Sequence, residues 1–130
     1  MLLFMGMFDT HPETRQFFGF SNNSTIAEDP KHVKRLREHG LRFMGLVKKL
    51  LTCIDDNDRF DSILLELGKR HIDYNADISL VDVFGEQFVI SIRPTLKHCW
   101  NPKIEEAWTQ LFKYIASMMK RGMLERAAAT

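Results

Sequence analysis

The spacing of hydrophobic residues along this chain of 130 residues predicts helices rather than strands. Between residues 31 and 54, apolar side chains recur at steps of three, four or seven, which is a helical period and not the alternation of a strand. These positions are Val33, Leu36, Phe43, Val47, Leu50 and Ile54. Asp29 and Pro30 precede the run, where a capping carboxylate and a first-turn proline are favoured. We therefore expect a helix from residue 31 to residue 54.

Two more helices are predicted in the middle of the chain. After the polar break DDND, a second apolar stripe has the same period and ends on an imidazole; its members are Phe60, Ile63, Leu64, Leu67 and His71. A third helix is expected to begin at Ser79, whose hydroxyl can cap it while Asp82 reaches back three residues later. We expect Pro94 to stop this helix. The β-branched residues within it, in DVFGEQFVISI, do not outweigh its length and pattern.

A fourth helix is expected after Asn101 and Pro102, with Gly122 as its terminator. Its apolar face carries Ile104, Trp108, Leu111, Ile115 and Met118. At the other end of the chain, MLLFMGMF is interpreted as the end of a helix, and residues 19–29 as a loop rich in Gly, Ser and Asn. Strand signals are nearly absent, so the sequence predicts an all-α fold in a single domain over residues 1–130.

Composition narrows the function. Eighteen basic residues against seventeen acidic ones leave a net charge of +1, which is not the footprint of a nucleic-acid or membrane-surface binder. The apolar start is only eight residues long and lacks a basic flank, so neither a signal peptide nor a membrane span is expected. Cys53 and Cys99 are too few for a disulfide framework and are interpreted as free thiols. These features favour a cytoplasmic protein.

Two histidines are the candidate chemistry. His39 and His71 stand 32 residues apart, each on or beside the apolar face of its own helix. Either one alone can be a core histidine that hydrogen-bonds a backbone carbonyl. A buried neutral imidazole can also offer a lone pair to a metal, but no carboxylate or thiol completes a tetrahedral zinc set with this pair. Two opposed histidines do complete the axial pair of a haem iron, and ten phenylalanines could line its pocket.

The sequence also resembles a known family over nearly its whole length. The stretches EHGLRFMG, LLELGKRH, GEQFV and EEAWTQLFKYIASMMKRGM, with THPETRQFFGF near the start, are similar to those of globins, most of all the neuroglobin and cytoglobin type of animal globins. The resemblance implies a globin fold around haem b (iron protoporphyrin IX). It also implies a chain that is N-terminally truncated, without the first helix and part of the second.

The resemblance assigns a role to individual residues. His71 matches the proximal histidine that binds the iron, and His39 matches the distal histidine across the ring. The other haem-pocket positions that it implies are Phe4, Phe18, Arg42, Phe43, Leu67, Val81, Phe84, Phe112 and Ile115. Phe18, Phe84 and Phe112 can equally be plain core, and Arg42 a solvated charge on a helix face.

Three functions follow as hypotheses. The first is a haem protein that reversibly binds oxygen, nitric oxide or carbon monoxide; its 32-residue interval resembles that of bis-histidyl, hexacoordinate globins, in which the distal histidine binds the iron when no gas is present. The second is a redox protein with nitric oxide dioxygenase, nitrite reductase or electron-transfer activity, which would need a separate reductase. The third is a partly ordered helical bundle that does not hold haem tightly.

Overall fold

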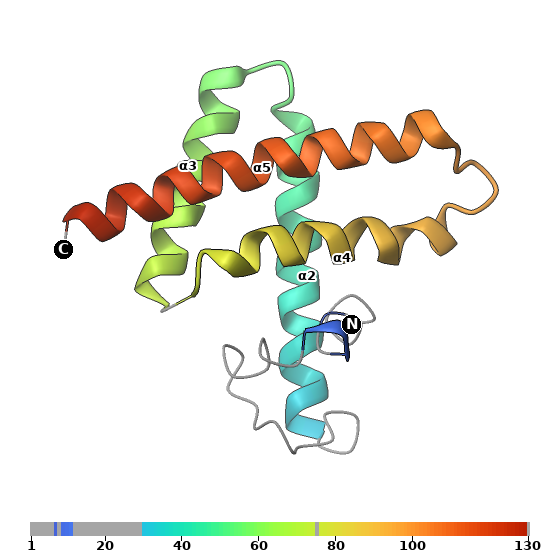
Figure 1. Ribbon diagram of the computed structural model, residues 1–130, viewed down its shortest axis with the longest axis horizontal. Coiled ribbons are helices and arrows are strands. Elements are labelled where there is room, and N and C mark those ends of the chain that lie inside the picture. The colour runs from blue at the N-terminus through green and yellow to red at the C-terminus, as the bar shows by residue number, and fades with distance from the viewer. Residues whose placement is uncertain (1–6, 8, 12–29, 75, 130) are drawn as a thin grey trace. The chain divides into compact units, whose positions relative to one another are not determined.

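Helices account for most of the described chain. The computed structural model describes residues 7, 9–11, 30–74 and 76–129, and none of these residues lies in a strand. Four long helices follow one another: α2 (Pro30–Thr52), α3 (Asn57–Asp73), α4 (Ser79–Thr95) and α5 (Pro102–Ala129) (Figure 1). The all-α prediction is therefore confirmed. The chain divides into two compact units, Met1–Ile63 and Leu64–Thr130.

The unit Met1–Ile63 contains α2, whose buried positions follow the predicted stripe. Leu36, Val47 and Leu50 are buried on this helix. The helix ends at Thr52, so Ile54, which the pattern assigned to the stripe, lies in the turn that follows and is exposed. Near the start of the chain, Met7 is buried, and its carbonyl accepts the His11 N–H at 2.7 Å. The loop predicted for residues 19–29 lies outside the described residues.

Side-chain caps explain where α3 and α5 begin. The Asp56 carboxylate accepts the Arg59 N–H at 3.1 Å, and the Asn101 side-chain oxygen accepts the Ile104 N–H at 2.9 Å. Each bond satisfies one of the N–H groups that the first turn of a helix leaves without a partner. The DDND break and Asn101 thus mark helix starts, as the sequence predicts.

The cap predicted for α4 is wrong. No side-chain hydrogen bond caps the helix at Ile78, the residue before its first turn. Instead, Asp77 accepts two bonds from Ser79, one from its N–H at 2.8 Å and one from its hydroxyl at 2.7 Å. Ser79 therefore donates its hydroxyl proton instead of capping, because an aspartate two residues earlier in an Asx turn offers a stronger, charged acceptor.

The two helix ends predicted from Pro94 and Gly122 are also wrong. Pro94 lies inside the last turn of α4, which ends one residue later at Thr95; a proline removes one hydrogen bond there but does not forbid the turn. Gly122 lies in the interior of α5, which continues to Ala129. Because Gly122 has no side chain, α5 can cross close to the backbone of α3 at this residue.

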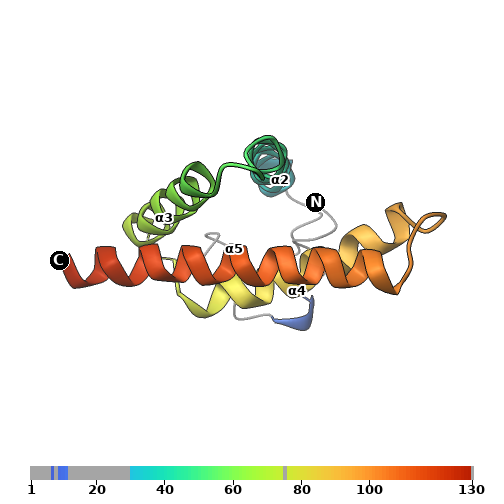
Figure 2. The same ribbon diagram turned by 90° about the horizontal axis from the view of Figure 1, so that it is seen from above.

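This crossing joins α3 to α5. A Cβ atom on Gly122 would lie less than 3.0 Å from the Leu65 carbonyl oxygen, and one on Gly68 less than 3.0 Å from the Met119 carbonyl oxygen. The two backbones therefore approach to a distance that only glycine allows, once from each helix. The two helices cross in Figure 1, and in Figure 2 the C-terminal end of α3 lies next to α5.

Helices α4 and α5 form an antiparallel pair around an aromatic core (Figure 1). The ring of Phe88 stacks on Phe112 with centroids 4.4 Å apart and lies 5.7 Å from Trp108. Such ring pairs add to the free energy gained from burying their surface. At the edges of this core, Arg93 pairs with Glu105 across the two helices.

We expect Phe88→Ala to cost the most stability of any single change in α4. The side chain is buried against two rings, so its loss leaves a cavity and should lower the free energy of unfolding by about 3–5 kcal/mol. Urea denaturation measures the difference. Ile90→Ala is the matched control, because Ile90 is 52% exposed on the same helix. Equal losses for the two variants would contradict an aromatic core between α4 and α5.

Acid should weaken the start of α4 through Asp77. The backbone N–H of Ser79, and then its hydroxyl, hold the pKa of the Asp77 carboxyl below its ordinary value of 3.8. A pKa that is lower in the folded chain means that Asp77 contributes stability above the unfolded value, and that this stability is lost as pH falls through the folded value. Asp77→Asn keeps an acceptor oxygen but does not titrate.

The unaltered chain should therefore lose more stability than the Asp77→Asn chain between pH 5 and about pH 2. Thermal unfolding across this range measures both, and the other carboxylates cancel in the comparison. Identical pH dependence in the two chains would show that the Asp77 bonds contribute nothing.

Candidate functional site

His71 lies in the last turn of α3 and has a defined orientation. Its ring Nδ1 is 2.7 Å from the carbonyl oxygen of Leu67, one turn earlier on the helix. A carbonyl oxygen can only accept, so Nδ1 must carry the proton and donate it. The other ring nitrogen, Nε2, then carries the lone pair, and no described residue is hydrogen-bonded to it. His71 is therefore a half-buried imidazole with an oriented, available donor atom.

The end of α3 is closed just beyond this ring. The His71 carbonyl accepts the Ala76 N–H at 2.9 Å, a bond that spans five residues and closes the helix C-terminus. The ring of Tyr74 meets the imidazole edge-on, with centroids 6.5 Å apart and planes at 69°. Tyr74 itself is 74% exposed, so it covers one side of the imidazole at the surface of the unit.

An ion pair attaches this end of α3 to α5. The guanidinium of Arg126 donates to both carboxylate oxygens of Asp73, from Nε at 3.0 Å and from an Nη at 3.3 Å. Two parallel bonds of this kind fix orientation as well as distance. Asp73 is two residues beyond His71, so the contact constrains the same helical turn.

The remaining predicted residues of this unit lie on three helices. Leu67 shares α3 with His71, and its carbonyl oxygen lies 2.7 Å from the imidazole Nδ1. Val81 and Phe84 are half-buried and three residues apart on α4. Phe112 and Ile115 are buried and three residues apart on α5. Of these, Phe112 stacks on Phe88 in the core between α4 and α5.

The residues predicted on the distal side of the haem belong to the unit Met1–Ile63. His39 and Phe43 are half-buried and one turn apart on α2, which puts them on the same side of that helix, and Arg42 is exposed. The structure brings these three together on one helix. The pairing of His39 with His71 across a haem stays a prediction. Phe4 and Phe18 lie outside the described residues.

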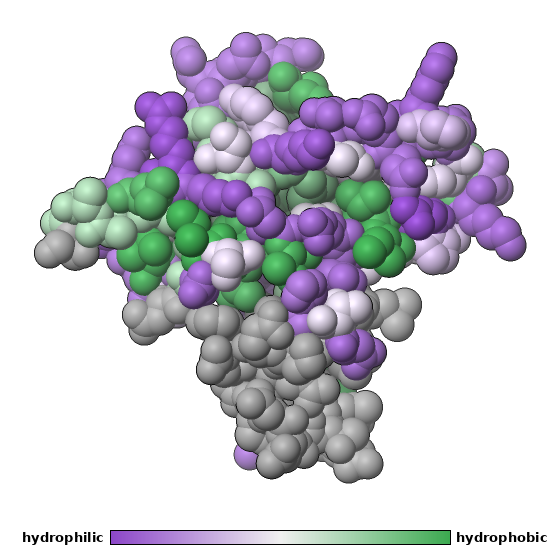
Figure 3. All heavy atoms as spheres, in the orientation of Figure 1, coloured by the Kyte–Doolittle hydropathy of each residue, from purple (hydrophilic) through white to green (hydrophobic). Residues whose placement is uncertain are grey.

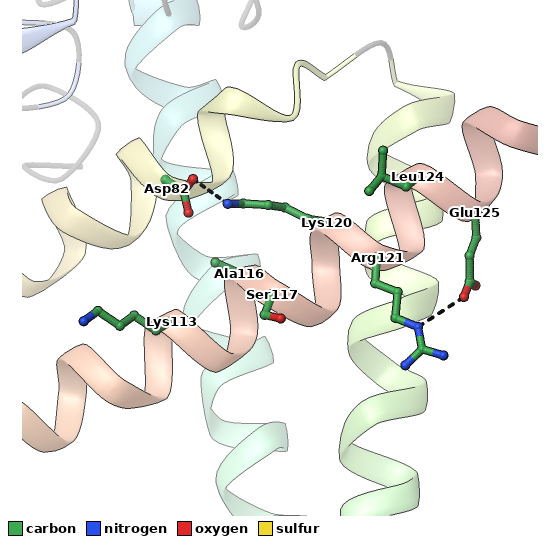
Figure 4. Close-up of a pocket in the computed structure, with 8 residues that line it drawn as sticks. All are labelled: Asp82, Lys113, Ala116, Ser117, Lys120, Arg121, Leu124 and Glu125. Carbon is green, nitrogen blue, oxygen red and sulfur yellow. Dashed lines mark hydrogen bonds and ion pairs between the residues drawn. The ribbon is translucent and has the colours of Figure 1, made fainter.

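A separate open pocket lies along α5. It has a volume of about 490 Å³, and the residues that line it are Asp82, Lys113, Ala116, Ser117, Lys120, Arg121, Leu124 and Glu125 (Figure 4). Two ion pairs involve lining residues: Lys120 of α5 pairs with Asp82 of α4 at 2.5 Å, and Arg121 pairs with Glu125 along α5 at 3.4 Å. None of the predicted haem residues lines this pocket.

The surface of this face is mixed in character. Figure 3 shows hydrophobic side chains gathered over the C-terminal half of α5 and the start of α4, with charged ones between them. Leu124 is the most exposed large hydrophobic residue of α5, at 61%. Asp82 pairs with Lys120 and Glu125 pairs with Arg121, whereas Lys113 forms no ion pair with the described residues that line the pocket.

Protein side chains alone do not form a metal site in the described residues. No group of three or more His, Cys, Asp or Glu side chains there is arranged to hold an ion. Cys53 and Cys99 are free thiols, as predicted. No helix among the described residues has the length and hydropathy that a membrane crossing requires.

The sequence does not predict the contacts of the site that are made between residues far apart in the chain. Asp73 and Arg126 are 53 positions apart, and no pattern in the sequence connects them. The Leu67 carbonyl could have been found, since it stands four residues before His71 on a predicted helix and the ring can reach it. Gly68 and Gly122 gave a signal as glycines inside strongly periodic helices, which suggests a close packing contact.

The chain is similar to known proteins over most of its length. A family model described as Globin matches residues 2–119. Neuroglobin-2 of Oncorhynchus mykiss is 21% identical over 122 residues, which cover 94% of this chain and 77% of that protein. Neuroglobin of Danio rerio is 22% identical over the same shares of each chain.

Cytoglobin-1 of Oryzias latipes is 23% identical over 115 residues, which cover 88% of this chain and 65% of that protein. The family match covers far more than half of the chain and includes all four described helices, except for the end of α5. The chain therefore belongs to the globin family, whose members are all-α proteins that bind haem.

Proposed function

We propose that this globin binds haem b through His71 as the proximal iron ligand and reversibly binds a diatomic gas such as oxygen, nitric oxide or carbon monoxide. His39 is proposed as the ligand on the opposite side of the ring when no gas is present. The interval of 32 residues between the two histidines, which resembles that of bis-histidyl globins, supports the second assignment.

The hydrogen bond from His71 Nδ1 to the Leu67 carbonyl is the observation that carries the proposal. Histidines that bind a metal donate their other ring N–H to a carbonyl or carboxylate, which fixes the tautomer and makes the ligating nitrogen more basic. The 2.7 Å bond meets this requirement.

The other residues that the globin resemblance implies are compatible in type with a macrocycle. Val81 and Phe84 are half-buried apolar residues on α4 and Ile115 is buried on α5, and apolar side chains of this kind keep water from a bound ring. Arg42 is exposed on α2, where a guanidinium can pair with a carboxylate at the rim of the ring. When bound, haem supplies an iron centre that takes up small gases.

His39 would compete with the gas. Only the fraction of molecules in which His39 has moved away can take an external ligand, so the apparent affinity is lower than the intrinsic one by that fraction. Phe43 is one turn further along α2 on the same side of the helix, and if His39 is the distal ligand, the Phe43 ring would crowd the distal side of the haem.

The chain without haem should already hold His71 in the Nδ1-protonated tautomer. We expect ¹⁵N NMR of the histidine rings, at a pH where they are neutral, to show a protonated Nδ1 and an unprotonated Nε2 for His71. His98 is the matched control, because it is exposed in the α4–α5 connection and should show the tautomer mixture of free histidine. A protonated Nε2 at His71 would contradict the hydrogen bond from Nδ1 to the Leu67 carbonyl, on which the proposal rests.

Replacing His39 should change the coordination number of the haem iron, and with it the optical spectrum. In the full chain reconstituted with haem and reduced, we expect a six-coordinate optical spectrum that His39→Leu changes to a five-coordinate one. If about a tenth of the molecules are open at equilibrium, the affinity for carbon monoxide should rise about tenfold.

His98→Leu should leave both the spectrum and the affinity as they are, since its side chain is exposed. If His39→Leu also changed neither, His39 would not be an iron ligand. If the unaltered chain took up no stoichiometric haem, the proposed function would be wrong.

A further inference from the structure

We infer that α5 positions the iron-binding imidazole, through a set of four residues that hold the end of α3. Gly68 and Gly122 form the close crossing, and Asp73 and Arg126 form the ion pair beyond it; together they are named the α3–α5 contact. These are positioning residues, because each acts on His71 through the backbone. The inference rests on the proposed function of His71 and extends it to a helix that supplies no ligand.

The crossing fixes the backbone that orients the ring. Gly122 lies against the backbone of Leu65, where an added Cβ would also be 3.0 Å from the Leu65 Cα and carbonyl carbon. Gly68 lies against Met119 in the same way, and its added Cβ would be 3.1 Å from the Met123 nitrogen. The acceptor of the His71 ring proton is the carbonyl of Leu67, the residue next to Gly68. Any shift of the crossing therefore moves that acceptor.

The ion pair fixes the other side of the imidazole. His71 is three residues after Gly68 and two before Asp73, so one helical turn carries the ring between two attachments to α5. The bidentate pair with Arg126 opposes rotation and sliding of that turn, since both bonds must break together. With both ends attached, α3 cannot carry His71 away from α5 without breaking one of them.

The contact acts locally. Both members of the ion pair are about half exposed, so the pair contributes little to the stability of the whole chain. The neighbouring pair of Lys120 with Asp82 is a natural comparison, because it also attaches α5 to another helix and is similarly exposed. It reaches α4 and not α3, so it should have no effect on His71.

The test compares variants of the full chain in two states. Arg126→Ala removes the ion pair, and Gly122→Ala overfills the crossing. Lys120→Ala and Gly85→Ala are the controls; an added Cβ at Gly85 would make only ordinary contact with Phe112, at 3.7 Å. Without haem, amide hydrogen exchange is measured at His71 and, as a global reference, at Phe88. With haem, the rate of haem loss to an excess of an apoprotein acceptor is measured.

Without haem, we expect the exchange rate at His71, relative to Phe88, to rise about two- to fivefold in Arg126→Ala and about tenfold or more in Gly122→Ala. The same factors are expected for haem loss. Exchanging the two charges, with Asp73→Arg and Arg126→Asp together, should restore both rates to within about twofold. Lys120→Ala and Gly85→Ala should change neither ratio.

The outcomes separate this inference from the proposed function. If the chain binds haem but Arg126→Ala and Gly122→Ala behave as their controls do, the inference is overturned and the proposed function stands. If Gly122→Ala prevents folding, Arg126→Ala and the charge exchange still decide the question. If the chain binds no haem, faster exchange at His71 supports the α3–α5 contact, and unchanged exchange overturns it.

Discussion

The close crossing of α3 over α5 is the constraint on which the rest of this unit depends. Two glycines, one on each helix, let the backbones meet at a distance that no side chain permits. Because Gly122 serves this contact, α5 continues through a residue that would otherwise be expected to end it. The long helix thus reaches both the aromatic core with α4 and the ion pair with Asp73.

The chemistry of the site follows from this backbone arrangement. The crossing holds the segment that contains Leu67, and the Leu67 carbonyl accepts the ring proton of His71. The ring is then left with one lone-pair nitrogen in a fixed orientation. The backbone therefore orients the imidazole that we propose as the iron ligand of this globin.

The sequence predicted the elements well and their contacts poorly. Apolar periodicity located four helices, with bounds within a few residues except at the end of α5, because burial of one helix face requires that pattern. It failed at Ser79, Pro94 and Gly122, where a neighbouring carboxylate, a tolerated last turn and a helix crossing overrode the local signal. The ion pair of Asp73 with Arg126 joins residues 53 positions apart, and the hydrophobic pattern of the sequence does not indicate it. The imidazoles were found because histidine is rare on an apolar face, but their pairing across a haem is a question of tertiary structure.

The most direct test of the central claim is ligand replacement at His71. In His71→Gly, the imidazole is removed while the Leu67 carbonyl and the helix crossing remain, so free imidazole can enter the position that the ring leaves. Haem binding is measured by optical titration of the full-length variant with and without added imidazole. The account predicts weak haem binding that imidazole restores. Tight, stoichiometric binding by His71→Gly without imidazole would contradict it, because another residue would then hold the iron.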